Sequence, residues 1–268
     1  MVRVDIALAE AGLARSRNQA VALVEANRVI INGRAARKAS QDVPDGAKLE
    51  VLEAVDYVSR AGHKLAKALD EFGALEIVGK QALDVGASTG GFTDVLLRRG
   101  ASHVIAIDVG HDQIVPELLG NPRVTSIEGF NARELSTESL SEALGKQAPK
   151  IELVVADLSF ISLTLVLDGM VAVAPEADFV LLVKPQFEAG KHSLNAHGIV
   201  VDHRSRAEAI EQVALHAEKL GLRIVDLVRS QLPGTHGNIE YVLWMSPNQG
   251  EYLSQWMERV GTLTKEAR

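Results

Sequence analysis

The sequence contains no cysteine. This absence excludes disulfide bonds, thiolate metal sites and a cysteine nucleophile. The sequence also lacks a long apolar run, because the nearest candidate, residues 163–174, is interrupted by Asp168 and Gly169 and no segment reaches membrane-spanning length. The first eleven residues carry three charged side chains, which argues against a secretory signal. We therefore expect a cytoplasmic protein without a membrane partner.

Acidic residues outnumber basic ones, 35 to 28, for a net charge of −7. Residues 1–40 depart from this balance, because they hold seven Lys or Arg against three acidic residues. A basic segment on an acidic body indicates an anionic partner, although seven basic residues can also form an ordinary solvated surface. The length of 268 residues, with 47% hydrophobic and 24% charged residues, fits a globular enzyme of one or two domains.

The first 55 residues contain signals for two helices and two strands. Gly12 follows a short amphipathic segment, Ser16 is placed to cap a second helix, and Asn32-Gly33 predicts a tight turn. The expected elements are helices at 4–10 and 17–26 and strands at 29–31 and 48–52. Such a unit is too small to form a large core. We therefore expect a small α+β domain that either packs against the rest of the chain or is joined to it by a linker.

Residues 82–108 carry the most informative pattern of the chain. A short apolar strand, 82–85, leads into a glycine-rich turn and a helix that begins near Gly91, and a second strand, 104–107, ends at Asp108. Glycines allow the backbone to approach a ligand closely, and an acid after the second strand reaches a ribose diol. This pattern predicts a nucleoside pocket, although a plain strand–turn–helix of another α/β protein has the same outline.

The spacing of the glycines favours S-adenosylmethionine over a dinucleotide. The turn lacks G-x-G-x-x-G, and Asp84 places an acid where a pyrophosphate would be repelled but a cationic amino-acid end would be attracted. The predicted cofactor contacts are Asp84, Gly86, Ala87, Ser88, Thr89, Gly90, Gly91, Asp108 and, after the third strand, Asn131.

Strand-like segments alternate with helical ones along the rest of the chain. Expected strands lie at 82–85, 104–107, 124–127, 152–156, 179–183, 223–228 and 241–245, and helices lie near Leu118 and at 139–144, 162–171 and 206–220. Regular alternation predicts an open, mostly parallel sheet with helices on both faces. The loop at 232–238 is too short for a crossover helix, so the last strand is expected to be antiparallel. The fold class is therefore α/β, with a seven-stranded sheet after the small N-terminal domain. Seven strands with an antiparallel last strand resemble the Rossmann-like methyltransferase sheet.

Four charged residues lie where the chemistry of such a sheet is expected. Asp157 and Lys184 end the fourth and fifth strands, Glu240 begins the last one, and Lys64 lies in a helix before the first. Because ligands bind at the carboxyl ends of parallel strands, we expect these side chains to meet. Each also has an ordinary interpretation, as a solvated lysine, a helix cap or the flank of an edge strand. Lys184 is the least ordinary, because it directly follows apolar residues 180–183, where an unpaired charge is costly.

The first forty residues resemble the S4 RNA-binding domain. The similarity is carried by Arg3-Val-Asp5, by residues 12–17 (GLARSR) and by residues 29–34 (VIINGR). In that family the second helix and the following loop present basic residues to folded RNA. The resemblance implies RNA contacts, which give affinity and register rather than base identity, through Arg3, Arg15, Arg17, Arg28, Arg34 and Lys38.

Together with the later segments, the chain resembles the TlyA family of rRNA 2′-O-methyltransferases, whose members also carry the name hemolysin A. The matching blocks are 57–65 (YVSRAGHKL), 83–94 (LDVGASTGGFTD), 155–162 (VADLSFIS), 182–188 (LVKPQFE) and 233–241 (PGTHGNIEY). The resemblance implies an S4-like domain at 1–55, a linker at 56–63 and an FtsJ-like methyltransferase domain at 64–268. Residues 53–56 depart from the Arg-Ala-Trp-type linker of some members.

The resemblance also implies a reaction. The set Lys64, Asp157, Lys184 and Glu240 is similar to that of FtsJ-type 2′-O-methyltransferases, in which a lysine kept neutral by its surroundings accepts the proton of a ribose 2′-hydroxyl. Lys184 is then the base, Asp157 orients it, and Lys64 and Glu240 align the hydroxyl. The implied substrate is a cytidine of 23S rRNA, with 16S rRNA as a second target in some members. The implied partners are rRNA or ribosomal subunits, bound by a monomer.

Two other classes of protein stay open, a non-catalytic RNA-binding or ribosome-assembly factor and a pore-forming hemolysin. The four-residue set argues against the first, and the lack of a membrane span or a strongly amphipathic basic helix argues against the second. No metal is expected, because His192, His197 and His203 share one loop region without supporting ligands. Residues 190–198 are expected to form a mobile loop that closes over RNA, and Phe187 either packs or stacks on a base.

Overall fold

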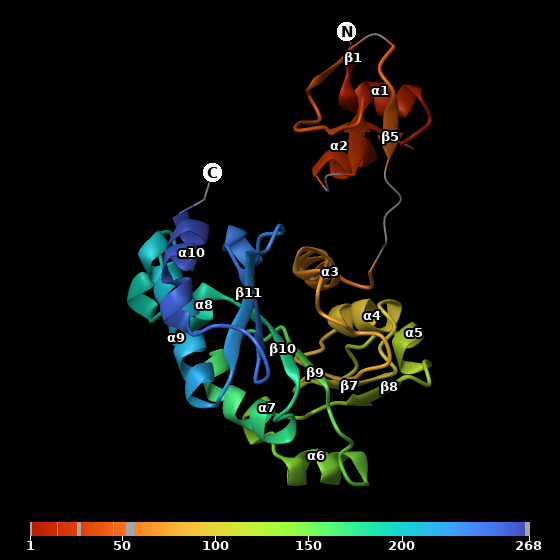
Figure 1. Ribbon diagram of the computed structural model, residues 1–268. Helices are drawn as coiled ribbons and strands as arrows, with labels where there is room; N and C mark the ends of the chain where they lie inside the picture. Colours follow the sequence, from red (N-terminus) through yellow and green to blue (C-terminus); the bar gives the residue numbers. More distant parts are fainter. Residues whose placement is uncertain (1, 15, 26–27, 45, 52–56, 266–268) are drawn as a thin grey trace. The chain divides into compact units, whose positions relative to one another are not determined.

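The computed structural model describes residues 2–14, 16–25, 28–44, 46–51 and 57–265 (Figure 1). The chain divides into two compact units, Met1–Asp56 and Tyr57–Arg268. Arg15, one of the expected RNA contacts, and residues 52–56, where the linker departs from some relatives, lie outside the described residues. Residues 57–63 of the expected linker fall within the second unit.

The first unit packs two short helices against two small antiparallel sheets. Ser16 caps the second helix as predicted, because its hydroxyl oxygen accepts a hydrogen bond from the Gln19 N–H at 3.2 Å. A small apolar core that includes Leu8, Leu23 and Val29 holds the unit together. One sheet pairs β1 with β4, and the other has the order β3-β2-β5. The elements of the unit are α1 (Val4–Glu10), α2 (Arg17–Glu25), β1 (Val2–Arg3), β2 (Val29–Ile31), β3 (Arg34–Ala35), β4 (Asp42–Val43) and β5 (Leu49–Val51).

A mixed seven-stranded sheet forms the centre of the second unit. Its strands are β6 (Gln81–Val85), β7 (His103–Ile107), β8 (Val124–Ile127), β9 (Leu153–Ala156), β10 (Asp178–Val183), β11 (Arg223–Arg229) and β12 (Tyr241–Ser246). They lie in the order β11-β12-β10-β9-β6-β7-β8. The strands from β6 to β10 run parallel, and β12 lies antiparallel between β10 and β11. The predicted fold class is confirmed, including the antiparallel last strand.

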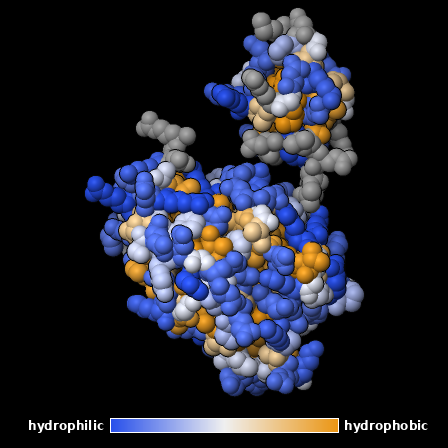
Figure 2. Space-filling view, in the orientation of Figure 1, coloured by the Kyte–Doolittle hydropathy of each residue, from blue (hydrophilic) through white to orange (hydrophobic). Residues whose placement is uncertain are grey.

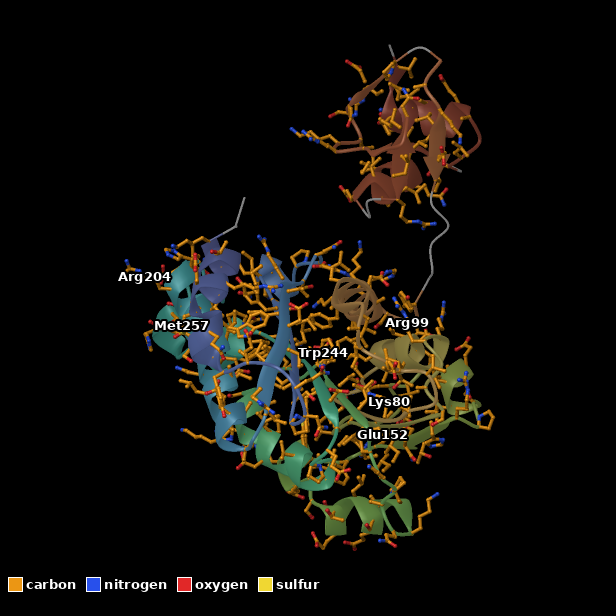
Figure 3. The ribbon with its side chains drawn as sticks, viewed as in Figure 1. Lys80, Arg99, Glu152, Arg204, Trp244 and Met257 are labelled. Carbon is orange, nitrogen blue, oxygen red and sulfur yellow. The ribbon has the colours of Figure 1, made fainter. Side chains whose placement is uncertain are left out.

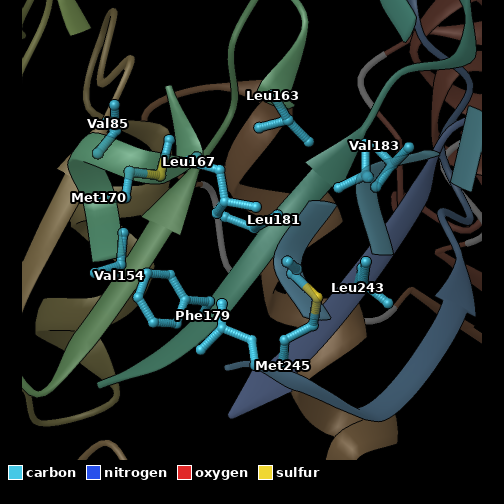
Figure 4. Packing of buried hydrophobic residues seen from close by; sticks show 14 of the residues in the cluster. Val85, Val154, Leu163, Leu167, Met170, Phe179, Leu181, Val183, Leu243 and Met245 are labelled. Atoms are coloured by element: carbon cyan, nitrogen blue, oxygen red, sulfur yellow. The ribbon is translucent and has the colours of Figure 1, made fainter. Parts of the chain in front are cut away.

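Helices cover both faces of this sheet (Figure 1). One face carries α3 (Arg60–Phe72), α4 (Gly91–Arg98) and α5 (Pro116–Leu119), and the other carries α6 (Thr137–Leu144), α7 (Leu167–Val173), α9 (His203–Lys219) and α10 (Leu253–Lys265). Successive strand residues alternate between the faces. Val180 packs in the core beneath α3, α4 and α5, and Phe179 and Leu181 pack with Met170 in the core on the opposite face (Figure 4). Apolar side chains on both faces are typical of a parallel sheet enclosed by helices.

The register of the strands gathers their ends at one edge, here called the carboxyl edge. Val85 lies opposite Ile107 and Ala156, and Val183 lies opposite Tyr241. The residues that follow the parallel strands therefore share this edge with the residue that precedes the antiparallel β12. These residues are Gly86, Asp108, Asp157, Lys184 and Glu240.

Polar contacts at the opposite edge of the sheet involve Lys80, Glu152 and Trp244, which are labelled in Figure 3. Lys80 pairs with Asp178 at 2.9 Å, and the Trp244 indole N–H donates to the same carboxylate at 3.3 Å. Glu152 accepts a hydrogen bond from the Gln81 N–H at 3.1 Å. These polar groups satisfy one another, so their role is to hold this edge of the sheet together.

Hydrophilic side chains dominate the surface of the second unit in Figure 2, with hydrophobic ones in small groups. Phe160 is the most exposed large hydrophobic residue of the described chain, at 90%. Within the ranges that the structure describes, no helix combines the length and the apolar character needed to cross a bilayer.

Candidate active site

The glycine-rich turn after β6 brings two loops of the carboxyl edge into contact. Gly86 has a φ of +83°, and a Cβ at this position would lie 2.8 Å from Leu158 Cδ2 and 2.9 Å from the Asp157 carbonyl oxygen. Only glycine fits such a backbone angle in so close an approach. Gly90, with a φ of +93°, ends the turn and leads into α4.

Two adjoining hollows open at this edge. The first, called the Lys184 hollow, has a volume of about 270 Å³ and lies between the turn and the beginning of α3. The second, called the Asp108 hollow, has a volume of about 410 Å³ and extends toward Asn131 and residues 157–161. Both are lined by Gly86, Ser88, Asp157 and Ser159, so the two hollows adjoin and together form one depression.

Most of the expected cofactor contacts line these hollows, namely Gly86, Ala87, Ser88, Thr89, Gly91, Asp108 and Asn131. Asp108 accepts hydrogen bonds from the Ser88 N–H at 2.8 Å and the Gly110 N–H at 2.7 Å, one on each oxygen. A carboxylate has about four acceptor sites, so capacity remains for a hydroxyl pair. Asn131 is fixed by the Arg133 N–H, which donates to its side-chain oxygen at 3.1 Å.

Asp84 and Gly90 line neither hollow. The Asp84 side chain is fully buried beneath the turn, where the Thr93 hydroxyl donates to its Oδ2 at 2.6 Å. Its Oδ1 has no hydrogen-bond partner. Burial raises the pKa of Asp84 to about 7, against the partial opposition of the Thr93 hydrogen bond. The structure therefore places this acid behind the wall of the site.

The four charged residues expected to meet at the carboxyl edge form two ion pairs. Lys184 Nζ lies 2.6 Å from Asp157 Oδ1, and Lys64 Nζ lies 2.5 Å from Glu240 Oε2. The lysine side chains are each 10% exposed and that of Glu240 is 2% exposed. Charges so deeply withdrawn from water are stable only when paired. The prediction that these four side chains contact one another at the carboxyl edge is thus confirmed for each of the two pairs.

Two residues that the sequence analysis did not single out complete the pairs. Ser159 accepts a hydrogen bond from Lys184 Nζ at 2.9 Å. Gln186, in the short helix α8 (Pro185–Glu188), donates to Glu240 Oε1 at 3.2 Å. Both lie within two residues of a predicted member, and that proximity was the only signal available for them.

An aromatic pair stands at the rim of the Asp108 hollow. Phe160 lines that hollow, has a φ of +65° and is exposed, and its ring centroid lies 5.2 Å from that of Phe187. Lys184 Nζ lies 5.9 Å from the centre of the Phe187 ring. A non-glycine residue at positive φ with an exposed aromatic ring indicates a functional constraint. The sequence analysis named Phe187 alone, because nothing in the pattern marks the backbone angle of Phe160.

In the first unit, a buried carboxylate gathers two of the expected RNA contacts. Asp5 is 2% exposed, and it pairs with Arg3 at 3.0 Å and with Arg17 at 2.8 Å. The hydrogen bond from Arg17 is the main reason why the pKa of Asp5 is lowered. Both arginine side chains remain about half exposed. Lys38 is exposed and Arg28 is partly exposed, while the side chain of Arg34 lies outside the described part of the chain.

The loop after α8 contains one short turn, η3 (Lys191–Ser193), and a bridge between Leu194 and Val200. Its expected closure over RNA stays a prediction. Among the residues that the structure describes, no three His, Asp or Glu side chains stand close enough to hold a metal ion.

Comparison with known proteins identifies both units. The FtsJ-like methyltransferase family matches residues 57–246, and the S4 domain matches residues 2–49. The 16S/23S rRNA (cytidine-2′-O)-methyltransferase TlyA of Mycobacterium tuberculosis is 46% identical over 255 residues, covering 94% of this chain and 92% of that protein. Hemolysin A of Brachyspira hyodysenteriae is 37% identical, covering 90% of this chain and 98% of its own.

A solved structure agrees with these relatives. A hemolysin-named protein of Streptococcus thermophilus is 34% identical, with a TM-score of 0.72, and covers 99% of this chain and 96% of its own. The name hemolysin and the name methyltransferase thus occur among relatives of one fold. With both units matched in order and the relatives covered nearly end to end, the chain belongs to the TlyA family of FtsJ-like methyltransferases that carry an N-terminal S4 domain.

Proposed function

We propose that this protein transfers a methyl group from S-adenosylmethionine to the ribose 2′-hydroxyl of a cytidine in rRNA. The observation that carries this proposal is the Lys184–Asp157 ion pair, which lines the depression at the carboxyl edge. The Lys64–Glu240 pair belongs to the same edge but lines neither hollow. The curated names of relatives, among them the 23S rRNA (cytidine-2′-O)-methyltransferase TlyA of Campylobacter jejuni, support the substrate. We infer that the enzyme acts as a monomer on rRNA or on ribosomal subunits.

The depression fits an extended nucleoside cofactor. The close approach at Gly86 leaves no room for a side chain, so the backbone itself forms the wall. Asp108 would hold the ribose diol, Asn131 would lie near the adenine, and the turn from Gly86 to Thr89 would hold the middle of the molecule. When bound, S-adenosylmethionine supplies a methyl group that is activated by a sulfonium sulfur.

The protein's own residues deprotonate and orient the hydroxyl. A ribose 2′-hydroxyl is a poor nucleophile until it loses its proton, and Lys184 Nζ is the group that would accept that proton. Asp157 and Ser159 hold this amine from two directions, at 2.6 and 2.9 Å. Lys64 and Glu240 would align the hydroxyl with the methyl group. Holding two reacting groups in the correct orientation lowers the entropic part of the reaction barrier. The rings of Phe160 and Phe187 offer a surface for the neighbouring base.

Replacing the proposed base tests the reaction. Lys184→Ala should leave binding of S-adenosylmethionine intact and lower methyl transfer by roughly 10²–10⁴-fold, the range for loss of a general base. Calorimetric titration measures binding, and reverse-transcription mapping at low nucleotide concentration on 16S and 23S rRNA measures the product. Lys150→Ala is the matched control, because Lys150 lies in an exposed ion pair with Glu176. A modification on the base, or undiminished activity of Lys184→Ala, would contradict the proposal.

A further inference from the structure

Glu188 binds a segment that lies far from it in the sequence. This glutamate ends α8, four residues after Lys184. Its Oε2 accepts a hydrogen bond from the Ser162 hydroxyl at 2.5 Å, and its Oε1 accepts one from the Leu163 N–H at 2.9 Å. Both oxygens are therefore engaged, by adjacent residues at the beginning of η2 (Leu163–Leu165).

The environment of this carboxyl is not that of an ordinary surface glutamate. Burial raises its pKa, while the hydrogen bonds from Leu163 and Ser162 oppose the shift. Withdrawing a carboxyl from water is unfavourable unless its acceptors are filled. Here two donors of the same turn fill them, so the two segments are fixed to one another through a single side chain.

These contacts close a ring that contains the proposed active site. The loop 157–163 carries Asp157 and Ser159, the two residues that hold Lys184 Nζ. The ring consists of α8 from Lys184 to Glu188, the hydrogen bonds from Ser162 and Leu163 to Glu188, the loop back to Asp157, and the Asp157–Lys184 ion pair. The same loop forms part of the wall of the Asp108 hollow.

We propose that Glu188 is a positioning residue, which holds the loop 157–163 against α8 so that Asp157, Lys184 and the wall of the Asp108 hollow keep their relative places. This inference rests on the proposed function, because it assigns Glu188 a role in that same reaction. Glu188 itself lines neither hollow. Its effect is expected to pass through the loop, since small misplacements of reacting groups lower rates strongly.

The test compares Glu188→Ala, Ser162→Ala and the double variant with the wild-type protein. Calorimetry gives the Kd of S-adenosylmethionine in the absence of RNA, and steady-state assays give kcat and the KM for RNA. Glu188→Ala should raise the cofactor Kd about tenfold and lower kcat by about ten- to a hundredfold, with the KM for RNA unchanged. Ser162→Ala should change both quantities in the same direction but less.

Two further comparisons separate positioning from general stability. Ser162 donates to Glu188 and also accepts a hydrogen bond from the Thr164 N–H at 3.2 Å. Because the Ser162–Glu188 contact is shared, the double variant should lose less than the sum of the two single effects. Glu188→Gln retains a carbonyl oxygen for the Leu163 N–H and should stay within about threefold of wild type. Glu176→Ala, which breaks an exposed ion pair far from the carboxyl edge, should leave Kd and kcat unchanged.

The outcomes distinguish this proposal from the proposed function. Wild-type Kd and kcat in Glu188→Ala, additive effects in the double variant, or a loss in Glu188→Gln as large as in Glu188→Ala would each overturn the positioning role. If Glu188→Ala does not fold, a Ser162→Ala variant with wild-type Kd and kcat overturns it equally. A wild-type protein that binds no S-adenosylmethionine, or methylates no RNA, would instead overturn the function itself.

Discussion

At the scale of single residues, Asp84 is the carboxyl whose ionisation the fold opposes most clearly. Its pKa in the folded protein is about 7, above the ordinary value of 3.8, because it is fully buried. As the pH rises from about 4 to about 7, the unfolded chain loses this proton while the folded protein keeps it. The free energy of unfolding must therefore fall across that window.

Asp84→Asn should remove this component of the pH dependence. Between pH 5 and pH 8, the Tm of the wild-type protein is expected to fall relative to the Tm of the variant, because only the wild type carries a group that ionises in the core. Thermal unfolding followed by circular dichroism at several pH values measures the difference. Parallel curves for the two proteins would show that Asp84 does not titrate in this range.

Asp5 offers a second test at this scale, in the first unit. Its buried carboxylate fixes the Arg3 and Arg17 guanidinium groups, and freely moving side chains lose more entropy when they bind phosphate. Asp5→Asn should therefore weaken RNA binding by about three- to tenfold, measured by filter binding, even though it removes a negative charge. Simple charge attraction predicts the opposite sign. Glu10→Gln, at an exposed position of the same unit, is the control and should bind RNA no more weakly than wild type.

The candidate site was predictable where a residue's place follows from the end of a strand. Asp157 and Lys184 share an edge because parallel strands end together, and Glu240 joins them because it precedes the antiparallel β12. The burial of Asp84 was not predictable, because its side chain turns toward Thr93 on α4, a contact between elements that a pattern within one strand cannot show. The hydrogen bonds of Ser159 and Gln186 depend on side-chain conformation, which sequence periodicity does not encode.

At the scale of elements, the contact between α3 and α4 depends on two facing glycines. A Cβ on Gly62 would lie 2.7 Å from Tyr57 Cβ and 2.9 Å from the Gly91 carbonyl oxygen, and a Cβ on Gly91 would lie 2.9 Å from the Gly62 nitrogen. Because α4 begins at Gly91, this close packing also sets the position of the glycine-rich turn beside Arg60, which lines the Lys184 hollow.

Gly62→Ala should therefore lower the free energy of unfolding by about 1–3 kcal/mol, the range for overpacking. Gly261→Ala is its matched control, because Gly261 also lies within a helix but a Cβ there meets nothing within 4 Å. Alanine at such a position should stabilise by about 0.5–1 kcal/mol. Urea unfolding of both variants measures the two changes, and equal effects would show that the helix contact tolerates a methyl group.

The strands of the second unit were predicted almost residue by residue, because runs of apolar residues between glycine-rich or polar turns leave few alternatives. The helix α10 was missed, although Leu253, Trp256 and Val260 of its buried face recur at helical spacing. The strands β1, β3 and β4 were also missed. Each has two residues, too few for an alternation to be visible.

At the scale of the whole molecule, we propose a division of work between residues 1–55 and residues 64–268. A protein that lacks residues 1–55 should fold, bind S-adenosylmethionine with wild-type Kd and methylate rRNA poorly, because the second unit has its own large core. The RNA affinity of the full chain should fall steeply with salt, since phosphate contacts release counterions. Calorimetry, methylation assays and salt titration measure the three quantities. Full RNA activity of the shortened protein would contradict the division.

The position of β12 determines when the second ion pair can form during folding. The strand pairs with both β10 and β11, and it delivers Glu240 to a lysine 176 residues earlier in the sequence. Contacts of such large sequence separation carry a high cost of loop closure, and strand pairings of this kind slow folding. The Lys64–Glu240 contact therefore depends on the correct insertion of a strand between two others, whereas Lys184 and Asp157 are joined by neighbouring parallel strands.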